Sequence, residues 1–214
     1  MRRHFLVVSL LALFVGFISA NAKASMTSET IATFADPSRS SGKPLFKVDF
    51  TLRQITGEWG DNKTGLTLRI PYSGHTFTDA WFKMDLVHIT SVSGMSGQIG
   101  EGVINFYANG TSVDPLLIVS FAGGSVSRYG SGADERLITN NVTITGSEIA
   151  GTLSQEQFSF SFANPAKLLG STNWNDGFTA TAAFASSAIE IVEPTTICIL
   201  GLGSLCLVRR KKSA

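Results

Sequence analysis

The sequence predicts an all-β protein, built as an antiparallel β-sandwich or a jelly roll. Several segments alternate strictly between apolar and polar residues, and Gly, Asn and Asp residues that favour turns separate these segments. Apolar residues do not recur at helical spacing over several turns in any segment. The clearest strands are 46–52, 66–70 and 158–162, and the last of these directs its phenylalanines inward and its serines outward.

Weaker alternation predicts further strands along the same stretch. With the clearest strands they form one domain over residues 45–185, which is long enough to bury a sizeable core. Residues 25–44 are polar and form either a mobile arm or a loosely attached first strand, while 186–191 form a linker of small residues. The weaker strands are 77–82, 84–92, 99–107, 116–121, 137–144, 148–153 and 178–184.

Residues 1–24 have the three parts of a secretory signal peptide. Two arginines precede an apolar stretch, and small residues follow it. Cleavage is expected after Ala24, with Ala22 as the alternative. An uncleaved N-terminal anchor is a second possibility, but both readings predict export of the chain.

The C-terminal end combines an acidic and proline-containing motif, Val192, Glu193 and Pro194, with an apolar run and a basic end. The apolar run 197–208 is predicted to be a transmembrane segment. It is short for this role, because as a helix it covers about 18 Å of a bilayer core of about 30 Å. Such a segment favours a temporary hold over a permanent span; the alternative is a terminal helix packed on the domain. The basic residues that should stay in the cytoplasm are Arg209, Arg210, Lys211 and Lys212.

This tail, residues 192–214, resembles the PEP-CTERM sorting signal of Gram-negative bacteria that produce exopolysaccharide. Glu193 and Pro194 match the family's Pro-Glu-Pro motif, and Val192 stands where the first proline is expected. The resemblance implies an exosortase as processing partner. It also implies a precursor tethered to the inner membrane and a mature protein at the cell surface or in the extracellular matrix, but it implies no activity of the domain.

The charge of the exported stretch differs from that of the whole chain. Residues 25–191 hold 10 of the 17 Lys and Arg and 15 of the 16 Asp and Glu, a formal charge of −5. An acidic domain argues against nucleic acid as a partner. Both cysteines, Cys198 and Cys206, lie in the apolar tail, so the exported domain has no disulfide.

Residues with catalytic chemistry are few, and the chain is predicted not to be an enzyme. His75 and His88 lack the spacing of metal ligands, and no Gly-x-Ser-x-Gly motif is present. A glycan hydrolase remains a third alternative, because two carboxylates are sufficient for such an enzyme. The candidate pairs are Asp49 with Glu58, Asp79 with Asp85, and Asp134 with Glu135.

Aromatic residues suggest a binding role. Trp59, Trp81 and Trp174, with Tyr72 and Tyr129, are candidates for a platform on which sugar rings stack, although packing in the core or at the rim of a sandwich is the favoured explanation.

No cofactor is expected. Calcium is an alternative at the turns 61–62 and 175–177, which offer oxygen ligands without a full calcium loop.

These features predict an exported protein with a structural or adhesive role in the cell envelope or the exopolysaccharide matrix of a biofilm. The alternative is a carbohydrate-binding module that recognises extracellular polysaccharide through its tryptophans. The predicted partners are then the processing enzyme, the membrane, which the tail enters, and exopolysaccharide.

Overall fold

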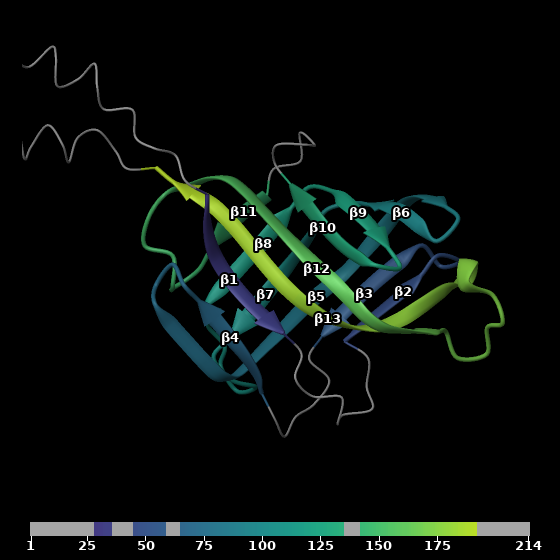
Figure 1. Ribbon diagram of the computed structural model, residues 1–214, viewed down its shortest axis with the longest axis horizontal. Coiled ribbons are helices and arrows are strands. Elements are labelled where there is room, and N and C mark those ends of the chain that lie inside the picture. The colour runs from purple at the N-terminus through teal and green to yellow at the C-terminus, as the bar shows by residue number, and fades with distance from the viewer. Residues whose placement is uncertain (1–27, 36–44, 59–64, 135–141, 192–214) are drawn as a thin grey trace, which may run out of the picture.

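Thirteen antiparallel strands make up the computed structural model, which describes residues 28–35, 45–58, 65–134 and 142–191 (Figure 1). Within these residues the one helical element is a single 3-10 turn, η2 (Trp174–Asp176). The all-β prediction is confirmed. The strands are β1 (Glu29–Ala35), β2 (Phe46–Asp49), β3 (Gln54–Glu58), β4 (Leu66–Ile70), β5 (His75–Ser93), β6 (Ser96–Ile99), β7 (Gly102–Tyr107), β8 (Leu117–Phe121), β9 (Gly124–Ser127), β10 (Gly130–Asp134), β11 (Val142–Thr145), β12 (Leu153–Lys167) and β13 (Gly177–Glu190).

Two long strands connect the layers of this sheet. On one edge β5 pairs first with β4 and then with β3, and on the other edge first with β7 and then with β6. β13 pairs with β12 along most of its length, while its other edge pairs first with β2 and then with β1. The path from β5 through β3, β2, β13, β12, β10, β9 and β6 therefore returns to β5. Strands that serve two neighbours in succession are typical of sheets that fold over a common core.

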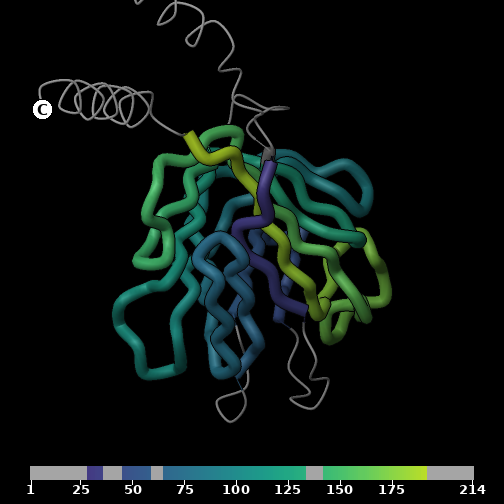
Figure 2. The backbone as a smooth tube through the Cα atoms, turned by 60° about the vertical axis from the view of Figure 1, so that its left-hand side comes forward, coloured from purple at the N-terminus to yellow at the C-terminus, as the bar shows by residue number. Residues whose placement is uncertain are grey.

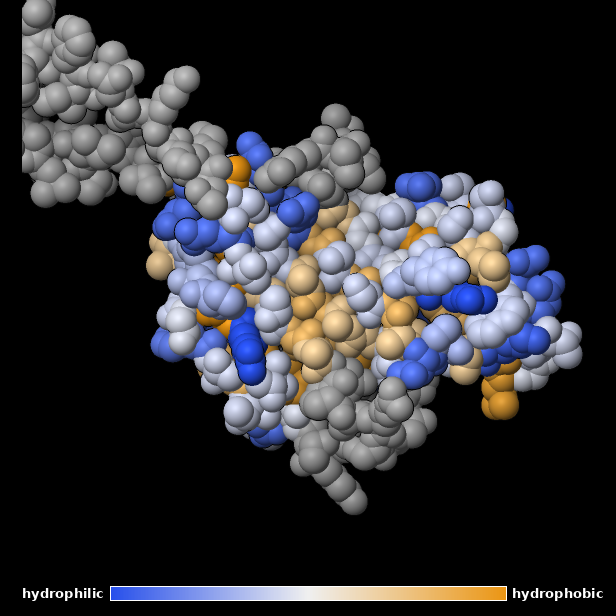
Figure 3. Space-filling model, viewed as in Figure 1, coloured by the Kyte–Doolittle hydropathy of each residue, from blue (hydrophilic) through white to orange (hydrophobic). Residues whose placement is uncertain are grey.

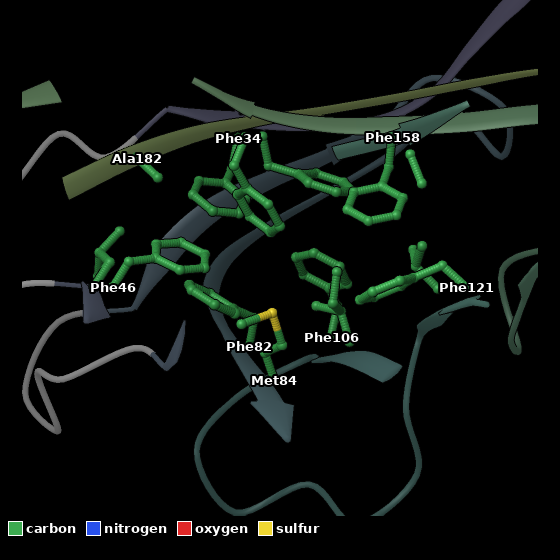
Figure 4. Packing of buried hydrophobic residues seen from close by; sticks show 14 of the residues in the cluster. Phe34, Phe46, Phe82, Met84, Phe106, Phe121, Phe158 and Ala182 are labelled. Carbon is green, nitrogen blue, oxygen red and sulfur yellow. The ribbon is translucent and has the colours of Figure 1, made fainter. Parts of the chain in front are cut away.

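The core between the layers is built from phenylalanine rings. Phe34 of β1 and Phe158 of β12 extend from one layer toward Phe82 of β5 and Phe106 of β7 in the other (Figure 4). Each of these rings is at most 4% exposed. Phe160 of β12 lies among them, with its ring centroid 4.7 Å from that of Phe46 and 5.1 Å from that of Phe184. Tilted and edge-on contacts of this kind add to the free energy of burial.

The strongest alternating segments form strands as predicted. Strand 66–70 is confirmed in full, and 158–162 lies within the longer β12, where Phe158 and Phe160 are buried and Phe162 packs against the core. The segments 77–82 and 84–92 are one continuous strand, β5, whereas 99–107 is divided at Gly100 into the end of β6 and β7. Segment 178–184 is part of β13 and 116–121 corresponds to β8; residues 137–141 lie outside the described residues.

Two strand predictions need correction. The strand expected over 46–52 ends at Asp49, because the Asp49 carboxylate accepts a 2.8 Å hydrogen bond from the backbone N–H of Leu52 and closes a turn there. Leu52 is therefore 63% exposed and does not continue the buried face. The strand expected over 148–153 is wrong. Its first residues form turns stabilised by bonds such as that from the Ile149 N–H to the Gly146 carbonyl.

The segments on either side of the predicted domain also contribute strands. Residues 29–35 of the expected arm form β1, with Ile31 and Phe34 buried, so the first-strand alternative describes them better. Residues 186–190 of the expected linker continue β13, where Ala188 and Ile189 are buried. Small side chains suit this position because β1 lies directly alongside.

The beginning of β1 and the end of β13 lie side by side at one end of the molecule (Figure 2). Glu29 pairs with Ala188, and the Ile191 N–H bonds to the Thr152 carbonyl. The signal-peptide segment 1–24, with Ala22 and Ala24, and the tail 192–214 lie outside the described residues. Among the residues that are described, no helix is long and apolar enough to cross a membrane.

Candidate functional site: a groove and a cation–aromatic cluster

A shallow groove of about 770 Å³ runs across the outer face of five adjacent strands, β1, β13, β12, β10 and β9. Figure 3 shows this face, with apolar and weakly polar residues in its middle and more hydrophilic residues around it. Adjacent strands lie about 4.8 Å apart, so the groove extends over about 19 Å. Side chains that line it include Thr30, Thr33, Ser125, Ser159, Ser187 and Tyr129.

The groove exists because the strands present small side chains on this face. Outward positions of β12 carry Ser159, and those of β10 carry Gly130 and Gly132. A Cβ added at Gly130 would lie 2.2 Å from the carbonyl oxygen of Phe160, which shows how closely β10 approaches β12. The face is consequently hollowed along strands that are held rigidly by their pairing.

A cluster of cationic and aromatic side chains stands at the turn between β9 and β10. The guanidinium carbon of Arg128 lies 5.0 Å from the ring centroid of Trp174 and 5.6 Å from that of Tyr129. The Nζ of Lys167 lies 5.9 Å from the Trp174 ring and donates a 2.7 Å hydrogen bond to the Thr172 carbonyl. Cations placed over aromatic rings in this way are attracted by the negative ring face.

The guanidinium of Arg128 has no anionic partner among the described residues. It makes no ion pair with them, and its buried Nε has no hydrogen-bond acceptor. Asp176, in the same turn as Trp174, instead accepts a 2.6 Å bond from the Ser171 hydroxyl. Because a buried donor without an acceptor costs free energy, Arg128 is a candidate for binding an external anion.

The tryptophans singled out in the sequence lie in different surroundings. Trp81 lies between the buried Ala80 and Phe82, pairs across the strands with Tyr107, and is half-buried against the core. Trp174 is half-buried against the core beside Arg128. The structure does not bring these two rings together, and Trp59 lies outside the described residues. Glycan binding by any of them stays a prediction.

Comparisons with models of protein families, with curated proteins and with solved structures found no match. The function must therefore be argued from the residues of this chain.

A second polar cluster lies near the end of β13. The Tyr72 hydroxyl donates a 3.0 Å hydrogen bond to Glu190, and His75 Nδ1 lies 2.6 Å from a carboxylate oxygen of Glu148. Burial, and next the bond to Glu190, raise the pKa of the Tyr72 phenol. A hydrogen bond from Ser73 and the neighbouring His75 hold the pKa of Glu148 below its ordinary value, against the opposing effect of burial.

This cluster predicts a pH-dependent contribution to stability. Because the folded-state pKa of Glu148 is lowered, its stabilising effect is present above the unfolded pKa and is lost as the pH falls through the folded pKa. We expect Glu148→Gln to lower the free energy of unfolding by less than about 1 kcal/mol at pH 7, and the difference from wild type to shrink toward pH 3. Urea unfolding at both pH values measures it. A difference that grew on acidification would contradict this account.

The candidate catalytic carboxylates have ordinary structural surroundings. Asp49 is 6% exposed and caps the turn after β2, with Lys47 Nζ 3.6 Å away. Glu58, Asp79 and Asp85 are exposed on their strands, as is His88 on β5, and the side chains of Asp134 and Glu135 are not described.

Among the described residues no three His, Cys, Asp or Glu side chains lie close enough to hold a metal ion. Of the two turns considered for calcium, 61–62 lies outside the described residues. In the other, 175–177, Asp176 is engaged with Ser171.

A buried carboxylate escaped prediction. Glu156 of β12 is 7% exposed, and its Oε1 accepts a 2.6 Å hydrogen bond from the backbone N–H of Ile144 in β11. The pairing of β12 with β13 is interrupted by a bulge between Ser154 and Gln157, where Gln155 has a φ of 50°. The sequence offers one signal for this burial, which is that Glu156 lies two residues before Phe158 and so shares the inward face of Phe158 and Phe160.

Proposed function

We propose that the chain is an exported, surface-sorted protein with a structural or adhesive role in the cell envelope or exopolysaccharide matrix of a Gram-negative bacterium. The observation that carries the proposal is the combination of a signal peptide over residues 1–24 with a three-part tail over 192–214. The tail is a substrate for an exosortase-type enzyme, and its apolar segment 197–208 tethers the precursor to the inner membrane until it is cut. The described part of the chain is its exported, sandwich-like β domain.

Two features of the domain support this role. The described chain starts and ends at the same end of the molecule, where β1 begins beside the end of β13, and the groove strands extend away from this end. The core is apolar and large, so that the domain needs no disulfide or metal to fold outside the cytoplasm. Both features suit a domain that is presented at a membrane and then released into the matrix.

Deletion of residues 192–214 tests the sorting proposal. Fractionation of the producing cells should recover the full chain with the inner membrane and cell surface, whereas the deleted chain should be released to the periplasm or medium. As a matched control, Glu193→Ala with Pro194→Ala keeps the apolar segment and should accumulate as an uncut precursor of larger mass. A deleted chain distributed between the fractions as the full chain is would overturn the proposal.

A carbohydrate-binding module is the second candidate, and the groove favours it. The groove is open, long and rich in hydroxyl groups, as a binding surface for a polymer requires. The two candidates are compatible, because an adhesive matrix protein needs a ligand.

A further inference from the structure

The lining of the groove has the hydrogen-bonding character of a sugar site. The hydroxyls of Ser125, Ser159 and Thr33 line it and form no hydrogen bond with the described residues. A hydroxyl both donates and accepts, as the hydroxyls of a sugar do. Serine, which is depleted in protein interfaces, is the most frequent residue type in the lining, whereas Met, Trp and Arg are not among the described residues that line the groove.

The end of the groove nearest the turn between β9 and β10 is lined by an aromatic ring, and a positive charge lies beside this ring, outside the lining itself. Tyr129 lines the groove and is 77% exposed, so one face of its ring is open to a ligand. The Arg128 guanidinium stacks beside this ring and lacks an anionic partner among the described residues. Guanidinium groups bind carboxylates through paired hydrogen bonds, and aromatic rings stack on the C–H faces of sugars.

We infer that the groove binds one strand of an acidic polysaccharide, with Tyr129 stacking on a sugar ring and Arg128 pairing with a sugar carboxylate. The domain is acidic overall, so an acidic polymer can be attracted only where positive charges gather. Arg128 and Lys167 provide such a place, because both lie near the ring of Trp174. This inference rests on the proposed matrix function and adds the class of ligand to it.

Binding to polygalacturonate and to its methyl ester tests the inference, since the two polymers share a backbone and differ in charge. We expect the full-length chain, purified in mild detergent, to bind the acid at least about tenfold more tightly than the ester at low salt in affinity electrophoresis. Arg128→Gln should remove this preference for the acid. Tyr129→Ala should weaken binding to both polymers about tenfold, and Tyr129→Phe should retain it.

Two glutamate substitutions separate the groove from the rest of the surface. Ser159→Glu places a larger, negative side chain in the middle of the groove and should abolish binding. Ser91→Glu, an equally exposed position on β5 outside the groove, should bind as wild type. Circular dichroism and thermal unfolding of each variant confirm that the fold is kept.

Three binding results would overturn the inference. They are the absence of binding to either polymer, equal affinity for acid and ester in the wild type, and unchanged binding by both Tyr129→Ala and Ser159→Glu. Self-association of the wild type that Ser159→Glu abolishes would assign the groove to a second copy of the chain and would also overturn it. None of these outcomes affects the fractionation test, so a failure of the groove and a failure of sorting are distinguishable.

Discussion

Phe160→Ala is expected to lower the free energy of unfolding by about 3–5 kcal/mol. The ring is 2% exposed and lies within 6.2 Å, centroid to centroid, of Phe34, Phe46 and Phe184, among others. Removing it leaves a cavity where both layers meet, and rings held by separate strands cannot collapse into it. Urea unfolding, compared at constant m value, measures the loss.

Two control variants of β12 make this prediction specific. Phe160→Leu keeps most of the buried volume and should cost clearly less than Phe160→Ala. Ser161→Ala lies next to it on the exposed face and should change the free energy of unfolding by no more than about 0.5 kcal/mol. Equal losses for Phe160→Ala and Ser161→Ala would show that this ring is not at the centre of the core.

Strong alternation predicted the strands whose inward residues are large. Leu66, Leu68 and Ile70 are fully buried in β4, and the phenylalanines of β12 direct themselves to the same core. In such segments the burial of apolar area outweighs the local turn preferences, so the period of two is sufficient to identify the strand and its buried face.

Small residues concealed the strands that the sequence did not predict correctly. β13 continues through Ser186 and Ala188, whose side chains bury little area, and its continuation depends on pairing with β1. The Ser186 hydroxyl even hydrogen-bonds the backbone of Ala32 across these strands. Pairing between segments so distant in the chain has no local sequence signal, and a short alternating segment such as 148–153 is equally compatible with a turn.

The groove was beyond sequence reasoning for the same reason. Its lining comes from five strands that are not consecutive in the chain, and each contributes serines, threonines or glycines that look like ordinary solvent-facing residues. Tyr129 was recognised as a candidate aromatic residue, but its neighbour Arg128 was not. Only the fold places Arg128 against Trp174 and shows that it has no ion-pair partner among the described residues.

Gly177→Ala is expected to lower the free energy of unfolding by about 3 kcal/mol or more. Gly177 begins β13 with a φ of 136°, which side chains disfavour, and an added Cβ would lie 2.2 Å from the Val48 carbonyl oxygen. That carbonyl belongs to β2, the strand with which the start of β13 pairs. Relief of the contact therefore requires β2 and β13 to separate at the point where η2, which contains Trp174, leads into β13.

Gly74→Ala is a control in which a positive φ is present without a steric contact. Gly74 also has a positive φ, 76°, but nothing lies within 4 Å of an added Cβ in the turn before β5. It should cost only about 1–2 kcal/mol, the penalty of the left-handed conformation itself. Urea unfolding of both variants measures how much more the conformation and the close contact at Gly177 cost than a left-handed turn residue. If Gly177→Ala cost no more than Gly74→Ala, the close approach of β13 to β2 would contribute little to stability.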